Sequence, residues 1–173
     1  MPSPSHALSS VAPTPTPSLP ATAGIPTQAE IISAVARWLP TYSYFELPAT
    51  LYVLTGTSDF QIGFDARRPT LLEAESRQAI SAALGADHKV IFVDDPTPLI
   101  PSPHPDVAVS WDWGDGGALV GFSMDVNALT SAQPNVVASV NNGDRGTDVL
   151  VTVGWEDSSW EVVTVGRPAQ WVT

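Results

Sequence analysis

Apolar residues first recur at helical spacing in the segment that follows Thr27 and Glu30. These two residues have the spacing of a capping box, in which each side chain bonds the backbone of the other. The pattern predicts an amphipathic helix over residues 28–39 that stops at Pro40 and packs on the core. Its apolar positions are Ile31, Ile32, Val35, Trp38 and Leu39.

A second helix is predicted after Thr70 and Glu73, which have the same capping-box spacing. This helix ends at Gly85, a residue type that often terminates helices. The positions expected to point inward are Leu72, Ile80, Ala83 and Leu84.

Strands are predicted on both sides of the second helix. Residues 50–56 are rich in β-forming side chains, and residues 60–65 alternate between apolar and polar side chains, with Phe60, Ile62 and Phe64 on one face. Together they predict a hairpin with one buried face. Residues 90–93 predict a short buried strand.

The second half of the chain alternates with period two over most of its length. Strands are predicted over residues 107–113, 120–126, 136–140, 148–155 and 160–166. The first two strands have Val107, Val109, Trp111 and Trp113, then Val120, Phe122, Met124 and Val126, on single faces. The predicted fold is α+β: two helices packed on a sheet in the N-terminal half and an antiparallel β-meander of about five strands in the C-terminal half.

Composition separates the start of the chain from the rest. The first 29 residues contain no Asp, Glu, Lys or Arg, and seven of the first 26 are proline. We therefore expect residues 1–26 to form an extended Pro/Ser/Thr-rich arm, because such a segment buries little apolar surface. Residues 27–173 are expected to form a single acidic α+β domain with a proline-rich connector at 96–105.

The charge of the chain is strongly negative and uneven. There are 18 acidic and 7 basic residues, a net charge of −11, and residues 87–173 hold twelve of the acids against three bases. Such a surface repels phosphate backbones, so direct nucleic-acid binding is not expected, and it attracts basic partners. There is no cysteine, hence no disulfide or thiolate metal site. No membrane span or secretory signal is predicted, so the chain is expected in the cytoplasm or inside a particle.

The most distinctive motif is Trp111-Asp-Trp-Gly-Asp-Gly-Gly117. It resembles the Trp-Asp-Phe-Gly-Asp-Gly signature of PKD-type β-sandwich domains, in which this turn joins two strands. The resemblance covers these residues alone, since Ala-Leu-Val-Gly-Phe follows here where those domains have other motifs. The motif therefore predicts a hairpin turn at Asp115-Gly116.

Catalytic and metal-binding patterns are weak. Asp94 and Asp95 end a predicted strand, and His104 and Asp106 follow nearby, but no metal-ligand spacing such as His-x-x-x-His is present. There is also no Gly-x-Ser-x-Gly elbow for a nucleophilic serine. We expect no metal, no cofactor and no catalytic residue, with Asp94 and Asp95 at a solvated strand end.

Tryptophan and neighbouring acidic residues supply the predicted binding site. Trp155 and Trp160 flank one predicted hairpin loop, beside carboxylates that suit the Arg or Lys of a basic partner. Most of the six tryptophan rings are expected to be buried, with Trp155 or Trp171 the most exposed. The predicted binding residues are Trp111, Trp113, Trp155, Glu156, Asp157, Trp160, Glu161 and Trp171.

The sequence thus predicts a non-enzymatic protein-interaction or assembly subunit, of the virion or particle-component type. Its partner would be another protein, basic in character, or copies of itself. One alternative is an acidic inhibitor or immunity-type protein that neutralises a basic partner, and another is a carbohydrate-binding module that uses exposed tryptophan rings. The last is a hydrolase or metal enzyme built on Asp94, Asp95, His104 and Asp106.

Overall fold

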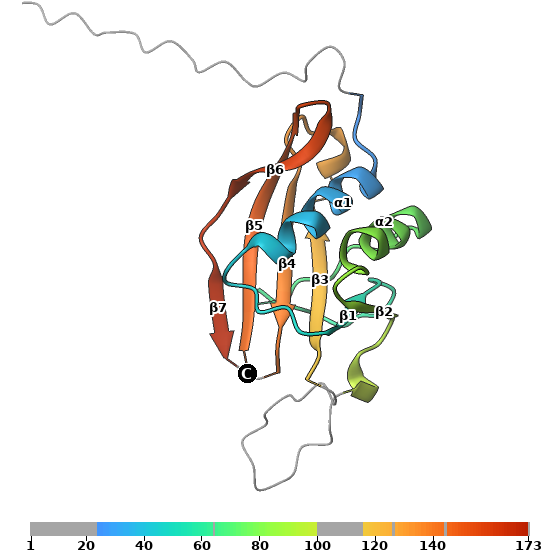
Figure 1. The fold of residues 1–173 in the computed structure, drawn as a ribbon, viewed down its shortest axis with the longest axis vertical. Coiled ribbons are helices and arrows are strands. Elements are labelled where there is room, and N and C mark those ends of the chain that lie inside the picture. The colour runs from blue at the N-terminus through green and yellow to red at the C-terminus, as the bar shows by residue number, and fades with distance from the viewer. Residues whose placement is uncertain (1–23, 64, 100–115, 126, 144, 173) are drawn as a thin grey trace, which may run out of the picture.

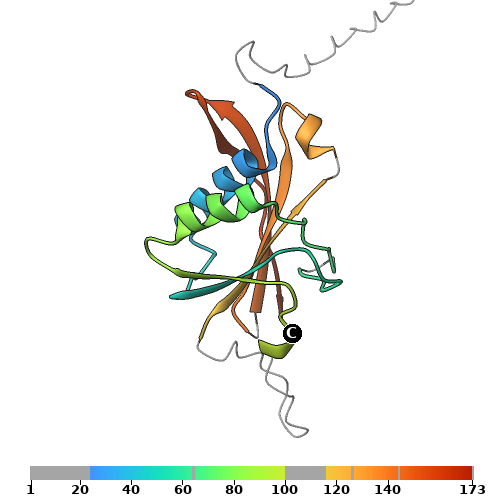
Figure 2. The same cartoon turned by 90° about the vertical axis from the view of Figure 1, so that its right-hand side faces the viewer.

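The structure, a computed structural model, describes residues 24–63, 65–99, 116–125, 127–143 and 145–172. These residues form two α-helices and a seven-stranded mixed sheet, which confirms the predicted α+β class. The strands from the N-terminal half of the chain are parallel, and those from the C-terminal half are antiparallel (Figure 1). Both helices lie on one face of the sheet, as Figure 2 shows.

Helix α1 spans Gln28–Trp38, close to the predicted range. The predicted capping box is present: the Glu30 N–H donates to Thr27 Oγ1 (3.2 Å), and the Thr27 N–H donates to Glu30 Oε2 (2.8 Å). A 3₁₀ turn at Leu39–Thr41 follows and contains Pro40. Of its predicted apolar positions, Ile31, Ile32, Val35 and Leu39 are fully buried, and Trp38 is half-buried against the core.

The parallel part of the sheet is a β–α–β unit. Strand β1, Thr50–Leu54, leads through helix α2, Ala74–Leu84, to strand β2, Lys89–Val93, which pairs with β1 in parallel. A parallel connection needs such a crossover, because the chain must return to the same end of the sheet. Strand β2 was predicted to be buried, but it lies at the edge of the described sheet and is half-buried.

The predicted hairpin between residues 50–56 and 60–65 is wrong. Strand β1 pairs with β2 on one side and with β3 on the other, so neither edge is left for residues 60–65. Ile62 instead bridges Arg67 within a local turn. The alternation of apolar residues over 60–65 therefore does not reflect a strand: Phe60 and Ile62 pack on the sheet face opposite the helices. Phe64 lies outside the described residues.

The second predicted capping box is also wrong. Helix α2 begins at Ala74, and its N-cap Glu73 makes no side-chain capping bond. The Thr70 hydroxyl instead accepts a hydrogen bond from the Met124 N–H (2.7 Å). The Glu73 N–H donates to the side chain of Gln28, in α1 (3.0 Å). Thr70 and Glu73 therefore form hydrogen bonds with residues distant in sequence and not with each other.

The antiparallel part contains five strands: β3 Ala118–Met124, β4 Asn135–Asn141, β5 Arg145–Glu156, β6 Ser159–Val165 and β7 Ala169–Val172. The predicted strands over 136–140, 148–155 and 160–166 correspond to β4, β5 and β6. The full order is β2-β1-β3-β4-β5-β6, and β7 pairs with the beginning of β5. Strand β7 was not predicted from the sequence.

The predicted strand over residues 107–113 lies outside the described residues, as do Asp115 and Val126. The described strand after it, β3, has β1 as a parallel neighbour and β4 as an antiparallel neighbour. Within the ranges given above, no helix is long and apolar enough to cross a membrane.

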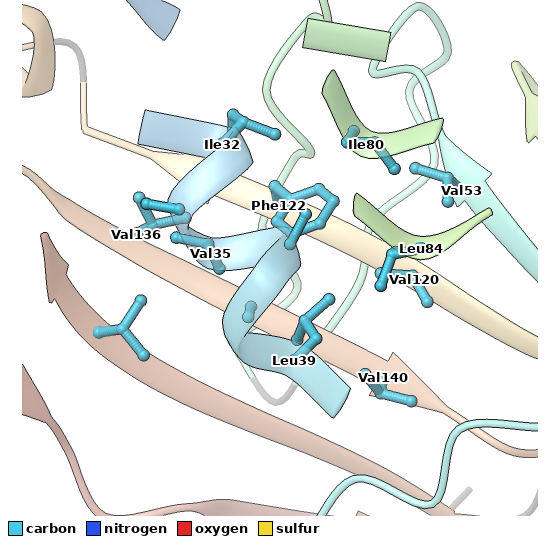
Figure 3. Packing of buried hydrophobic residues seen from close by; sticks show 14 of the residues in the cluster. Ile32, Val35, Leu39, Val53, Ile80, Leu84, Val120, Phe122, Val136 and Val140 are labelled. Atoms are coloured by element: carbon cyan, nitrogen blue, oxygen red, sulfur yellow. The ribbon is translucent and has the colours of Figure 1, made fainter. Parts of the chain in front are cut away.

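The main core lies between the two helices and the sheet (Figure 3). The side chains at its centre are each at most 3 % exposed, and together they fill the layer between helices and strands. They are Ile32, Val35, Leu39, Val53, Ile80, Leu84, Val120, Phe122, Val136 and Val140. A smaller cluster on the opposite face contains Tyr52, Leu54, Ile62 and Leu119.

One buried polar side chain joins the two helices. Gln28, at the start of α1, accepts hydrogen bonds from the Ser76 hydroxyl (2.7 Å) and the Glu73 N–H (3.0 Å). Its amide nitrogen donates to the carbonyl oxygen of Leu71 (3.0 Å). The three partners come from α2 and the segment before it. This one side chain therefore fixes the position of the first turn of α2 relative to the start of α1.

Replacing Gln28 by alanine should destabilise the protein by about 3 kcal/mol, because it leaves several buried polar groups without partners. The Tm should fall by roughly 10 °C in a domain of this size. Thermal unfolding followed by circular dichroism measures the change. Gln78→Ala, on the exposed side of α2, is the matched control and should shift the Tm by about 1 °C or less. Equal Tm values for the two variants would contradict the role of Gln28.

Candidate functional site

Five of the predicted binding residues lie at or beside the turn between β5 and β6: Trp155, Glu156, Asp157, Trp160 and Glu161. Trp155 pairs with Trp160 and Glu156 with Ser159, so the turn has two central residues. Asp157 and Ser158 have φ values of 46° and 71°. Positive φ at both positions is the condition for a type I′ turn, which matches the twist of the two strands. The turn lies at the end of the sheet where α1 begins (Figure 1).

Two tryptophan rings meet at the base of this turn. The Trp155 and Trp160 centroids are 5.6 Å apart, and the rings are inclined at 70° in an edge-to-face arrangement. Trp160 is 4 % exposed and belongs to the main core, whereas Trp155 is half-buried. Trp160 therefore anchors the turn to the domain, and part of the Trp155 ring remains exposed to solvent.

Helix α1 completes the site on the other side of the rings. Arg37 donates from Nη2 to the carbonyl oxygen of Trp160 (3.0 Å) and from Nη1 to the Ser33 hydroxyl (2.7 Å). Between α1 and the turn lies a cleft of about 400 Å³. Glu30 and Ser158 also line it, so the cleft has an aromatic floor and polar walls.

Carboxylates surround the turn. Glu156, Asp157 and Glu161 are all exposed, and Glu161 accepts a hydrogen bond from the Ser159 hydroxyl (2.8 Å). Negative charge therefore dominates this end of β5 and β6. We call the cleft and these carboxylates the tip surface. Its residues are Glu30, Ser33, Arg37, Trp155, Glu156, Asp157, Ser158, Trp160 and Glu161.

Trp171 lies far from the tip surface. It is on β7, opposite Gly146, and its Nε1–H donates to Asp148 at the beginning of β5 (3.4 Å). Trp155 lies nine positions after Gly146 along β5, which corresponds to about 30 Å of extended chain. Trp171 instead lines a separate cleft of about 540 Å³. The remaining predicted binding residues, Trp111 and Trp113, lie outside the described residues.

The carboxylates at the end of β2 are held by local hydrogen bonds. Asp94 accepts a hydrogen bond from the Thr55 hydroxyl at the end of β1, and Asp95 accepts one from the Thr97 N–H (2.9 Å). Hydrogen bonds from Thr55 and Thr57 lower the pKa of Asp94, and those from Thr97 lower the pKa of Asp95. Both groups are therefore ionised at neutral pH.

The other members of the predicted metal set, His104 and Asp106, lie outside the described residues. Within the part of the chain that the structure describes, no three His, Asp or Glu side chains come together as metal ligands.

A larger cleft, of about 620 Å³, lies on the sheet face that bears Leu150, opposite the helices. Leu150 is 49 % exposed there. Arg67 and Arg68 line the cleft, but they form ion pairs with Asp65 and Asp59. Those pairs reduce the positive charge that the arginines offer to a ligand.

Sequence reasoning missed the part of the tip surface that comes from α1. Glu30, Ser33 and Arg37 are spaced three and four residues apart, which places them on one face of the predicted helix. This polar stripe was visible in the sequence. The contact between α1 and the β5–β6 turn was not, because it joins segments more than a hundred residues apart.

Comparison of the chain with protein-family models, with curated proteins and with solved structures finds no match. The site must therefore be interpreted from its own chemistry.

The hydrogen bonds to Asp94 should make stability depend on pH in the acid range. Its pKa is lowered in the folded state, so the stabilisation is complete above the unfolded pKa of about 3.9 and is lost as pH falls through the folded value. The Tm of Asp94→Asn should thus be lower than that of the unchanged protein at pH ~6 and approach it at pH ~2. Thermal melts across this range measure the difference.

Thr55→Val removes the hydroxyl donor and keeps the carboxylate, so it should weaken the same pH dependence. A constant Tm difference between Asp94→Asn and the unchanged protein at every pH would contradict the assignment.

Proposed function

We propose that this protein is a non-enzymatic interaction protein, of the kind that serves as a subunit of a larger assembly, and that its tip surface binds a basic segment of a protein partner. The observation that carries the proposal is the position of a half-buried tryptophan, Trp155, over a cleft beside exposed carboxylates. Tryptophan is among the commonest residues at the energetic centre of protein interfaces.

The chemistry of the tip surface favours arginine or lysine on the partner. A guanidinium or ammonium group can lie on the Trp155 ring as a cation–π contact while it pairs with Glu30, whose side chain lines the same cleft. Glu156 and Glu161 alternate with the tryptophans along β5 and β6, so they face the other side of the hairpin and act through longer-range attraction. Arg37 donates hydrogen bonds to the Ser33 hydroxyl and to the Trp160 carbonyl oxygen, so it holds α1 against β6 beside the cleft. The net charge of −11 adds long-range attraction, which raises association rates with basic partners.

The test is affinity capture of partners from cells of the source organism, with the full-length chain as bait. The double variant Glu156→Lys/Glu161→Lys should lose a basic partner that the unchanged bait retains, and its affinity should fall by a factor of about ten or more. Binding to the unchanged bait should also weaken as salt is raised. Glu46→Lys/Asp87→Lys makes the same change in net charge at exposed positions away from the tip, and should retain the partner.

Identical sets of captured proteins on all three baits would contradict the proposal, as would a retained partner that is acidic. Capture of one basic enzyme whose activity falls on binding would instead support the inhibitor alternative.

The N-terminal arm is proposed to contribute to assembly and not to the stability of the domain. Residues 1–23 consist largely of Pro, Ser, Thr and Ala, so they supply few large apolar side chains for a core. Deleting residues 1–23 should therefore change the Tm by no more than about 2 °C while it weakens partner capture. A truncated chain that is insoluble, or that unfolds at a much lower temperature, would contradict this role.

A further inference from the structure

A second cleft lies at the end of the sheet where β5 begins, away from the tip surface. Its volume is about 540 Å³, within the range of about 300–1,000 Å³ that is usual for small-molecule sites. Its floor is formed by β4, β5 and β7, and its wall by the segment that follows α1, at Tyr44, Phe45 and Glu46. Figure 1 shows this segment crossing the sheet below α1.

The side chains of the floor come from one face of the sheet. Thr147 lies opposite Val140 on β4 and opposite Gln170 on β7, and directly opposed residues share a face. Val140 belongs to the main core, so this is the face that carries the helices. Asn142 and Arg145 continue the pairing, since the Asn142 N–H donates to the Arg145 carbonyl (2.9 Å), and they lie on the same face by alternation. The floor is therefore mainly polar.

The wall of the cleft is held in place on both sides of Tyr44. The Asn142 side chain donates from Nδ2 to the carbonyl oxygen of Glu46 (2.8 Å). The Phe45 ring is buried in the main core and packs edge-to-face on Tyr42. Tyr44 itself is 54 % exposed, with its ring centroid 5.4 Å from that of Tyr42. An aromatic ring is thus presented to solvent from a fixed backbone, which lowers the entropic cost of binding.

The hydroxyl of Thr147 is the second feature that indicates a ligand. Thr147 is only 8 % exposed, and no group in the described part of the chain forms a hydrogen bond with its hydroxyl. In that same part, no side-chain polar atom that is sealed from solvent lacks a partner. The Thr147 oxygen is therefore reached from the cleft, which this residue lines. A nearly buried hydroxyl is costly when it is left without a hydrogen bond, so a polar ligand stabilises this arrangement.

The charges of the cleft favour a neutral ligand. Among the described residues that line it, Glu46 and Arg145 carry opposite charges and the others carry none. A phosphate or a polycation would therefore find no excess of opposite charge. The amides of Asn142 and Gln170 and the Thr147 hydroxyl both donate and accept hydrogen bonds, as the hydroxyl groups of a sugar also do.

We propose that this cleft binds a neutral saccharide. The apolar C–H face of one sugar ring lies on Tyr44, and its hydroxyl groups bond to Thr147 and to the amides of Asn142 and Gln170. Trp171 also borders the cleft, but its ring packs on Gly146 and its Nε1–H donates to Asp148, so it is engaged within the domain. This activity is additional to protein binding at the tip surface, and either proposal stands without the other.

Isothermal titration calorimetry of the full-length chain with glucose, galactose, mannose, N-acetylglucosamine, maltose, cellobiose and lactose tests the proposal. At least one of these sugars should bind with a Kd of about 1 mM or lower. Tyr44→Ala should weaken that binding about tenfold, because the ring beneath the sugar is lost. Tyr44→Phe keeps the ring, so its affinity should stay within about threefold of that of the unchanged chain.

Thr147→Val removes the hydroxyl and keeps a β-branched side chain that suits a strand, so it should weaken sugar binding about tenfold without lowering the Tm. Thr164→Val, the same change at an exposed position of β6, is the matched control and should leave the affinity unaltered. Failure of every sugar in the panel to bind at concentrations up to ~10 mM would overturn the proposal. Binding that neither Tyr44→Ala nor Thr147→Val weakens would overturn it as well, because the sugar would then lie elsewhere.

Discussion

Both helices bury their apolar faces on the same side of the sheet, and the positions of the other features follow from this packing. Helix α1 crosses the antiparallel strands, so Arg37 reaches the Trp160 carbonyl and a cleft forms beside the β5–β6 turn. Helix α2 carries the chain back for a parallel pairing, which places β2 at the outside of the described sheet. The hydrogen bonds of Gln28 to Glu73 and Ser76 hold the two helices together.

The tip surface combines a well-packed aromatic ring with exposed carboxylates. Trp160 is part of the core, so the Trp155 ring that packs against it is held by the domain and loses little freedom on binding. The carboxylates beside it are exposed and solvated, so in the proposed interface they would attract a basic partner at long range and lose hydration only on contact. This division of roles suits an interface in which an aromatic anchor supplies affinity and charge supplies selectivity.

The two edges of the sheet have different protection. At one edge, β6 and β7 share the long strand β5, and exposed Glu161 and Arg167 discourage further pairing. At the other, β2 has four consecutive apolar residues, with Lys89 at its beginning and Asp94 and Asp95 after its end. Among the described strands, charge therefore protects the β6 and β7 edge more than the β2 edge.

Periodicity alone determined the α+β class, the range of α1 with its capping box, and strands β4 to β6, because these elements are specified by neighbouring residues. It also placed Trp155 and Trp160 on either side of one hairpin loop, predicted over residues 156–159; the structure shortens this loop to the two residues Asp157 and Ser158. Only the tertiary structure decided which strand pairs with β1, why Thr70 caps no helix, and that Arg37 meets the turn. Those outcomes depend on contacts between residues far apart in sequence. Residues 60–65 lose both edges of β1 to β2 and β3, and the Thr70 hydroxyl bonds the Met124 N–H in place of a helix cap, although local sequence favours the other arrangement.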